Sequence, residues 1–303
     1  MSLCIGEMEI PKIVLLVVYN HRYDKNIPLV QKLYKDRFSN IYHLIPFYDG
    51  DIENVITVYE SSYHFQSYIS QAYQHLKHKD FTHYFIIADD LVLNPNINEQ
   101  NLLERLGVET DECWLPTDLI VLQEKHYGLW PHIFNALSYK TSSHGAEVSS
   151  ILPDINYAKS KFLQHKLPTG KIPMKVFSPW YKSNIRVNGL KLIQNWFAVL
   201  FGRRLSYPLV GGYSDIFLVT SDIMPTFAKY CGAFAATDLF VELAIPTSMV
   251  LAADKLKIGN NEQTADNTIG KGIEKHGNSL PELLNSFPDC QYLHPIKLSK
   301  WNF

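Results

Sequence analysis

Hydrophobic runs alternate with stretches of helical periodicity over the first ninety residues of the chain. Residues 12–19, 40–47 and 83–88 are rich in apolar and β-branched side chains, and the first run is apolar from end to end after its lysine. Such runs are typical of strands that are buried on both faces. Between them, residues 28–38 and 62–77 repeat apolar side chains at helical spacing. Strands that alternate with helices predict βαβ units and a mostly parallel sheet flanked by helices.

A similar pattern returns near the C-terminus. Residues 214–220 predict another strand, and residues 222–230 and 237–251 predict two helices. The second helix is expected to kink near Pro246, because proline cannot donate a backbone hydrogen bond inside a helix. Residues 259–277 are polar and rich in Gly and Asn, which predicts a loop. The C-terminal third therefore belongs to the same α/β class.

The middle of the chain, from 110 to 210, is less regular and strongly basic. Six prolines fall between positions 131 and 208. Residues 155–214 contain no Asp or Glu and have a net charge of +10, while the rest of the chain is at −12. A block of this kind predicts either an anionic partner or a solvated basic face. The ten basic residues are Lys159, Lys161, Lys166, Lys171, Lys175, Lys182, Arg186, Lys191, Arg203 and Arg204.

The apolar stretch 190–201 lies inside this basic block. Its twelve residues are too few to span a bilayer, so it is either a buried helix or a segment that lies in a membrane interface.

Composition narrows the cell compartment. The four cysteines are far apart and form no CxxC pair, which argues against a zinc site and suits a reducing cytoplasm. Acidic residues precede the short N-terminal apolar run, so no signal peptide is predicted. At 303 residues the chain suffices for one large or two small domains. The aromatic content of 13% suits either core filling or stacking on ligand rings.

Polar residues follow the predicted strands where each strand ends. Asn20 follows the first strand, Asp49 the second, and Asp89 and Asp90 end the run 83–88. In parallel sheets ligands bind outside the carboxyl ends of the strands. Adjacent carboxylates repel each other, and Mg²⁺ or Mn²⁺ relieves that repulsion. The alternatives are a helix cap or a pair of surface acids.

The segment IIADDLVL, residues 86–93, resembles the metal-binding segment of GT-A glycosyltransferases, which use nucleotide sugars. Their hallmark is an Asp-x-Asp motif that holds a divalent cation and the diphosphate. Ala88 replaces the first acid here, so the resemblance makes Asp90 the metal ligand and places Asp89 at the ribose or the sugar. Asn20 and Arg22 would help to seat the nucleotide, unless they are ordinary loop residues.

The final residues, LHPIKLSKW, are similar to the C-terminal segment of some retaining GT-A transferases. There a His completes the metal shell and a nearby Lys contacts the diphosphate. The resemblance makes His294 a candidate metal ligand and Lys297 or Lys300 a phosphate contact. A plain surface histidine is the alternative.

The segments GGYSDIFLVTSD and GAFAATDLFVELAIPT look like the acceptor side of such enzymes. Gly211 and Gly212 would allow close approach of the donor sugar, and Asp215, Asp238 and Glu242 are the candidate acids. Asp238 and Glu242 are four residues apart and would share a helix face, although Thr237 or Asp238 is also a candidate N-cap. One acid would take the acceptor proton in an inverting enzyme or stabilise an oxocarbenium-like transition state in a retaining one.

Together these features predict a GT-A-like, Rossmann-like α/β fold and a metal-assisted glycosyltransferase, with a UDP-sugar favoured as donor. Residues 1–110 would bind the nucleotide sugar, 111–210 would form an irregular basic insertion, and 211–303 would bind the acceptor. The expected acceptor is a glycan or a lipid-linked molecule in cell-surface glycan synthesis. Residues 155–214 would face an anionic membrane, which suggests a cytoplasmic enzyme at its inner face.

Two alternatives come from other classes. A nucleotidyltransferase would use the same sheet and cation, but the loop after the first strand has no glycine. A non-catalytic polyanion binder would act through residues 155–214 and show a steep salt dependence. Nucleic acid is not the expected partner.

Overall fold

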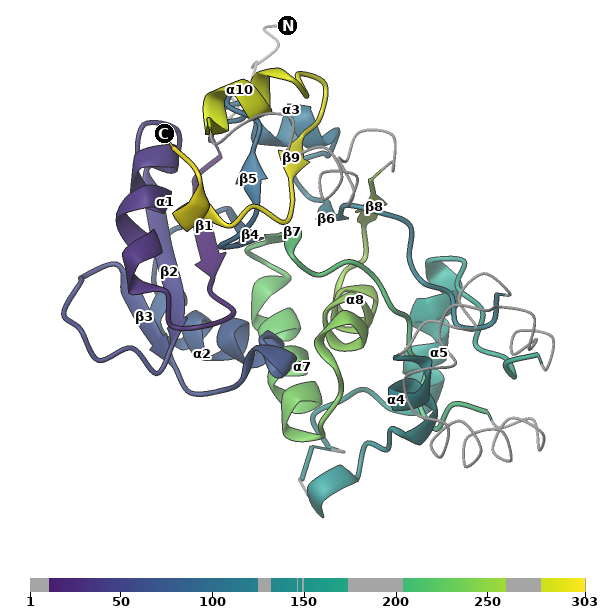
Figure 1. Cartoon of the computed structure of the whole chain (residues 1–303). Helices are drawn as coiled ribbons and strands as arrows, with labels where there is room; N and C mark the ends of the chain where they lie inside the picture. The colour runs from purple at the N-terminus through teal and green to yellow at the C-terminus, as the bar shows by residue number, and fades with distance from the viewer. Residues whose placement is uncertain are drawn as a thin grey trace, which may run out of the picture.

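The computed structural model describes residues 11–124, 132–145, 147–148, 150–173, 204–259 and 279–302 (Figure 1). Within these ranges a seven-stranded sheet has the order β3-β2-β1-β4-β7-β6-β8. Its strands are β1 Ile13–Val18, β2 Asn40–Pro46, β3 Val55–Val58, β4 His83–Ala88, β6 Cys113–Leu115, β7 Ile216–Thr220 and β8 Leu256–Ile258. A two-stranded sheet pairs β5 (Val92–Leu93) with β9 (Tyr292–Leu293).

Helices and 3₁₀ turns connect and cover these strands. The α-helices are α1 Ile27–Tyr34, α2 Gln66–Leu76, α3 Leu102–Leu106, α4 Ile133–Ser138, α5 Ile155–Gln164, α7 Met224–Ala236, α8 Val241–Ala252 and α10 Leu280–Asn285. The 3₁₀ turns used below are η1 Asp24–Asn26, η2 Ser62–His64, η4 Ser143–Gly145 and η8 Leu298–Lys300.

One strand of the central sheet runs against its neighbours. Strands β3, β2, β1 and β4 are parallel, whereas β7 is antiparallel to both β4 and β6. The start of β7 therefore lies at the carboxyl end of β4, where Ile216 is opposite Ile87. The backbone N–H of Ala88 donates to the carbonyl of Asp215 at 2.8 Å. This reversal brings residues from the C-terminal third to the tip of β4.

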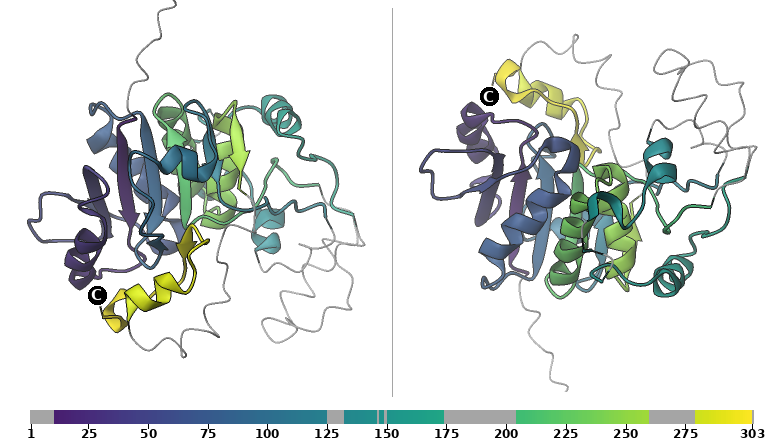
Figure 2. Two further views of the ribbon diagram at one scale, coloured as in Figure 1. Left: turned by 90° about the horizontal axis from the view of Figure 1, so that it is seen from above. Right: turned by 90° about the horizontal axis from the view of Figure 1, so that it is seen from below.

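The two faces of the sheet are covered by different helices. Alternate residues of β1 point to opposite faces, so Leu15 packs with α1 and Leu16 packs with α2 and α7. The C-terminal residues from Leu280 to Trp301 join the core on the α1 side. Figure 2 shows this segment, in yellow, beside α1, with α7 and α8 on the other face. The sheet therefore has one layer with α1 and the C-terminal segment on one face and another with α2, α7 and α8 on the other.

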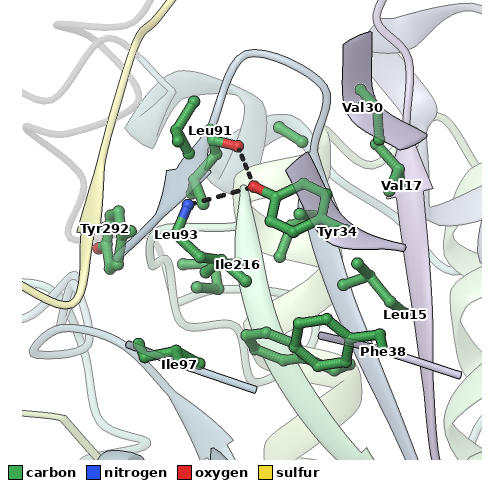
Figure 3. Packing of buried hydrophobic residues seen from close by; sticks show 14 of the residues in the cluster. Leu15, Val17, Val30, Tyr34, Phe38, Leu91, Leu93, Ile97, Ile216 and Tyr292 are labelled. Carbon is green, nitrogen blue, oxygen red and sulfur yellow. Dashed lines mark hydrogen bonds between the residues drawn. The ribbon is translucent and has the colours of Figure 1, made fainter. Parts of the chain in front are cut away.

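Tyr34 fixes the chain that follows the two aspartates. Its buried hydroxyl donates to the carbonyl of Leu91 at 3.2 Å and accepts from the N–H of Leu93 at 3.1 Å (Figure 3). Phe38 stacks on Phe85 beneath this turn, with 6.3 Å between ring centroids. Buried backbone groups must be hydrogen-bonded, and Tyr34 satisfies the two that flank the start of β5.

A third cluster of buried side chains lies beyond α8. Every residue of this helix except Glu242 is buried, because the helix packs against the sheet on one side and against α5 on the other. Lys161 of α5 donates to the carbonyl of Ala253 at 3.3 Å and pairs with Asp254 at 2.6 Å. A cation at the C-terminal end of a helix complements the helix dipole. Helix α5 is therefore attached to the rest of the fold through α8.

The α/β class and the mostly parallel sheet predicted from sequence are confirmed. The strands predicted over 12–19, 40–47, 83–88 and 214–220 are present. Strand β3 was missed, because a four-residue edge strand that follows polar residues gives little periodic signal. The helix predicted to end at residue 230 continues to Ala236.

Several predictions concern residues outside the described ranges. The apolar stretch 190–201, most of the loop 259–277, and Lys175, Lys182, Arg186, Lys191 and Arg203 of the basic block all lie there. Across the described ranges, no helix has both the length and the apolar character that a membrane crossing requires.

Candidate active site

The C-terminal segment reaches the tip of β4 through a short antiparallel ribbon. In it β5, which begins two residues after Asp90, pairs with β9, which ends immediately before His294. The N–H of Ile296 donates to the carbonyl of Asp90 at 2.6 Å. Figure 1 shows β5 and β9 side by side above the central sheet. The ribbon sets the register in which His294 faces Asp90.

Asp90, Asp215 and His294 come together at this point. His294 Nε2 lies 3.2 Å from Asp90 Oδ1 and 3.9 Å from Asp215 Oδ2. Its other ring nitrogen, Nδ1, is 2.6 Å from the hydroxyl of Tyr213, and Tyr213 stacks on Tyr292 with an angle of 17° between rings. The histidine is therefore held by a packed aromatic side chain while it faces two carboxylates.

The electrostatics of this cluster disfavour two free negative charges. Burial raises the pKa of Asp215, and the charge of Asp90 adds to that effect while His294 opposes it. Asp90 Oδ1 is enclosed and accepts no hydrogen bond from the described residues. An enclosed carboxylate oxygen of this kind is costly unless a positive charge compensates it.

The donor types fit a divalent cation, because Mn²⁺ and Mg²⁺ take carboxylate oxygens and Mn²⁺ also takes imidazole nitrogen. In the described part of the chain, however, no three His, Cys, Asp or Glu side chains converge on one metal position. Asp90 and His294 face each other instead. Asp90 and His294 are the residues at this edge that could hold a cation.

Asp89 points away from this cluster into the loop that follows β1. The residue is 4% exposed, and its carboxylate accepts hydrogen bonds from Asn26 Nδ2 at 3.1 Å and from the backbone N–H of Asn20. Burial and the neighbouring charge of Asp90 raise its pKa to about 7. Asp89 therefore ties the loop after β1 to the tip of β4, and Asn26 is a contact that the sequence did not indicate.

The other residues predicted to bind nucleotide border the same loop. Arg22 pairs with Asp49 from the loop after β2 and with Asp24 at 3.1 Å. The guanidinium holds the pKa of Asp49 below its usual range. The C-terminal turn η8 packs close to η1, which brings the exposed Lys297 and Lys300 towards this side. The structure thus gathers Asn20, Arg22, Asp49 and Asp89 at one edge.

Gly211 and Gly212 are buried and paired through their backbones. Gly211 exchanges hydrogen bonds with Ile120 at 2.7 and 3.0 Å, and the N–H of Gly212 donates to the carbonyl of Glu242 at 2.9 Å. A Cβ on Gly212 would lie 3.3 Å from Cβ of Pro246. These glycines therefore let the segment before β7 pack closely on α8, whose first turn contains the partly exposed Glu242.

The predicted helical placement of Asp238 is wrong. Asp238 precedes α8 in a left-handed conformation, with φ of 63°, so it shares no helix face with Glu242. The N-cap position belongs to Phe240 and has no side-chain cap. Thr237 does not cap α8 either, because its hydroxyl donates to the carbonyl of Ala233 in α7.

Asp238 contacts two histidines from distant segments. His64 Nε2 lies 2.9 Å from its Oδ1, and His144 Nε2 lies 3.7 Å from its Oδ2. Sequence reasoning indicated neither histidine. His64 lies in η2, which follows the loop after the missed strand β3. The local sequence therefore gave no indication that His64 lies at this edge of the sheet.

Comparisons with known proteins found a similarity of fold only. No protein-family model and no curated protein sequence matches the chain. Among solved structures the fold is similar to core-mannan synthase A from Aspergillus fumigatus in its Mn/GDP form. That similarity has a TM-score of 0.37 and 10% identity, and covers 84% of this chain and 74% of the other. These values are too low to transfer a function, so the functional assignment depends on the site itself.

Proposed function

We propose that the protein is a metal-assisted glycosyltransferase that moves a sugar from a nucleoside-diphosphate sugar to an acceptor hydroxyl. The observation that supports this most directly is the pairing of Asp90 with His294 at the tip of β4, with Asp215 beside them. Ligands of such sheets bind at this edge. A cation would compensate the negative charge of the enclosed Asp90 oxygen, which accepts no hydrogen bond from the described residues.

Asp90 and His294 would hold Mn²⁺ or Mg²⁺, with Asp215 close by. When bound, the cation supplies positive charge that stabilises the leaving diphosphate. The exposed Lys297 and Lys300 would contact the same phosphates, since lysine binds phosphate as a point charge. Tyr213 would keep His294 oriented, because its hydroxyl lies against Nδ1 and leaves Nε2 facing the carboxylates.

Residues 1–110 would bind the donor nucleotide. Asn20, Arg22 and Asp49 border the loop after β1 and would seat the nucleoside, with Asp89 towards the ribose or the sugar. Gly211 and Gly212 would border the donor sugar. A UDP-sugar is the favoured donor, and GDP- and CDP-sugars are the alternatives to be measured.

Residues 211–303 would bind the acceptor, a glycan or a lipid-linked molecule. Asp215, Asp238 and Glu242 are the candidate acids at this end. In an inverting reaction one of them takes the acceptor proton, and in a retaining one an acid stabilises positive charge on the sugar. Residues 155–214 would face an anionic membrane at the cytoplasmic side.

Release of nucleoside diphosphate tests the proposal. UDP-, GDP- and CDP-sugars are offered with a panel of oligosaccharides, with Mn²⁺ or with EDTA. We expect nucleoside diphosphate to be released from the sugars of one nucleotide and only when metal is present. The rate should be at least a hundredfold lower in Asp90→Asn. Asp80→Asn, a highly exposed aspartate that precedes β4, is the matched control. Metal-independent release, or equal rates in the two variants, would contradict the proposal.

A further inference from the structure

A second group of polar and aromatic side chains lies on the α2 and α8 side of the sheet edge, around Asp238. Three segments meet there: η2 contributes His64, the turn between α7 and α8 contributes Asp238, and η4 contributes His144. None of these residues belongs to the Asp90–His294 cluster. The chain segments that carry the two groups meet at Ser214, which precedes Asp215 and whose Oγ lies 3.5 Å from the carbonyl of Val241, three residues after Asp238.

The backbone of Asp238 is held in the left-handed conformation, which non-glycine residues adopt infrequently, although Asp does so more often than most of them. A φ of 63° costs a non-glycine residue about 1 kcal/mol or more. Surrounding hydrogen bonds enforce it: the N–H of Asp238 donates to Ala235, the N–H of Leu239 donates to Phe234, and the carbonyl of Leu239 accepts from buried Gln66 at 2.8 Å. The carboxylate is therefore placed by the fold rather than by its own preference.

His64 occupies the inner side of this carboxylate. Its Nε2 is enclosed and lies 2.9 Å from Asp238 Oδ1, as a close contact rather than an aligned hydrogen bond. Its Nδ1 is 4.0 Å from Glu60 Oε1, so the imidazole lies between two carboxylates. Because Nε2 is enclosed, a ligand from solvent meets Asp238 and not His64. The side chain of Asp238 is 56% exposed.

Aromatic rings lie directly beside this pair. Tyr63 contacts the ring of Phe240 at 4.6 Å, and His132 stacks on Phe240 at 3.6 Å with 14° between planes. Tyr63 also packs edge-on against His64 at 4.8 Å and is 43% exposed. The C–H faces of a pyranose ring are apolar and carry partial positive charge, so they pack well against the negative face of an aromatic ring.

We propose that Asp238 and the aromatic stack of Tyr63, Phe240 and His132 form the acceptor subsite for a pyranose of a glycan, with His64 as the residue that positions Asp238. This deepens the proposed function and depends on it. Of the three candidate acids, Asp215 faces His294 and its side chain is only 24% exposed, Glu242 is only partly exposed in α8, and Asp238, with 56% of its side chain exposed, is the most open to solvent. Asp238 is thus the acid that meets the acceptor hydroxyl.

The step balances without a further reactant. The acceptor O–H proton passes to the Asp238 carboxylate, and the acceptor oxygen forms a bond with the anomeric carbon of the donor. The bond from that carbon to the diphosphate oxygen breaks, and the diphosphate leaves with the electron pair. His64 is a positioning residue here, since it orients the carboxylate without contacting substrate.

Binding to a printed array of pyranose oligosaccharides tests the subsite independently of catalysis. We expect wild-type protein to bind a defined set of glycans and Tyr63→Ala to lose at least tenfold in affinity. Tyr59→Ala, which alters another exposed ring that pairs instead with Phe47, should bind as wild type does. Absence of glycan binding by wild-type protein, or equal losses in both variants, would overturn the subsite.

Steady-state kinetics then test His64. We expect His64→Phe to lower kcat at least tenfold with the donor KM unchanged, and His64→Gln, which keeps a polar group in contact with the carboxylate, to recover part of that loss. His75→Phe, on the exposed side of α2, is the control. An unchanged kcat in a folded His64→Phe overturns the role of His64. If the protein binds glycans but shows no metal-dependent transfer, the proposed function is contradicted, whereas a glycan-binding site at Tyr63 is supported.

Discussion

His294 Nε2 lies 3.2 Å from Asp90 Oδ1, although the two residues are far apart in the sequence. Their contact depends on two features of the fold. The reversed strand β7 brings Asp215 and Tyr213 to the tip of β4, and the β5–β9 ribbon lays the C-terminal segment across it. A site assembled from three distant segments in this way exists only in the folded protein, so ligands that bind it should stabilise the fold.

The raised pKa of Asp89 predicts that its negative charge at neutral pH destabilises the folded protein. Its pKa is about 7 in the folded protein against 3.8 ordinarily, so the folded state binds its proton more tightly than the unfolded state does. The contribution of Asp89 to the free energy of unfolding should then fall as pH rises from about 4 to about 7, by up to about 4 kcal/mol.

Asp89→Asn removes this titration and should stabilise the protein at pH 8 relative to wild type, with little gain at pH 4. Urea unfolding at the two pH values measures the difference. The exposed Asp51→Asn serves as control and should stay within about 0.5 kcal/mol of wild type. A gain that does not depend on pH would contradict the assignment.

The hydroxyl of Tyr34 should stabilise the chain that follows Asp90, so its removal should lower the free energy of unfolding. Tyr34→Phe leaves the N–H of Leu93 and the carbonyl of Leu91 without their partner in a buried position. We expect a loss of about 2 kcal/mol in the free energy of unfolding, since each orphaned buried group costs about 1–3 kcal/mol. Tyr42→Phe, half-buried on β2, is the matched control. Equal stability of the two variants in urea titrations would show that the Tyr34 hydroxyl is dispensable.

His43 predicts acid sensitivity of the β1–β2 region. It is fully buried between the hydroxyl of Tyr19 at 2.9 Å and the amide of Gln31 at 2.8 Å, and burial lowers its pKa to about 4. The unfolded state, with an ordinary pKa of about 6.5, then binds a proton before the folded state does. The stability that His43 contributes above about pH 6.5 should be lost as pH falls towards 4, by about 3 kcal/mol.

His43→Gln keeps hydrogen-bonding groups but does not titrate, so its stability should fall less than that of wild type over this range. Thermal unfolding at intervals between pH 7 and pH 4 gives the comparison. Parallel curves for the two proteins would exclude His43 as the source.

The sequence was informative where structure is local. The continuous run of β4 and the two acids at its end predicted a strand tip at a ligand-binding edge, and the helical spacing predicted α1 and α2. The placement of His294 followed from a resemblance of the C-terminal segment and not from periodicity, since β9 has only two residues.

What the sequence did not reveal depends on contacts between distant segments. An Asp four residues before a Glu reads as part of a helix, but Asp238 is left-handed because Gln66 and the end of α7 hold the following backbone. Tyr213 and His64 owe their roles to side chains far along the chain. No periodic or turn signal encodes such partners.

The central claim, that Asp90 and His294 form a metal and nucleotide-diphosphate site, is tested most directly by thermal unfolding with UDP, GDP and CDP, each with Mn²⁺ and with EDTA. The account predicts a rise in Tm of several degrees with one nucleotide, only when Mn²⁺ is present, and its loss in Asp90→Asn and in His294→Ala. Asp80→Asn should keep the rise. Equal shifts in all the variants, or no shift with any nucleotide, would contradict the claim and leave Asp90 and His294 as a structural pair.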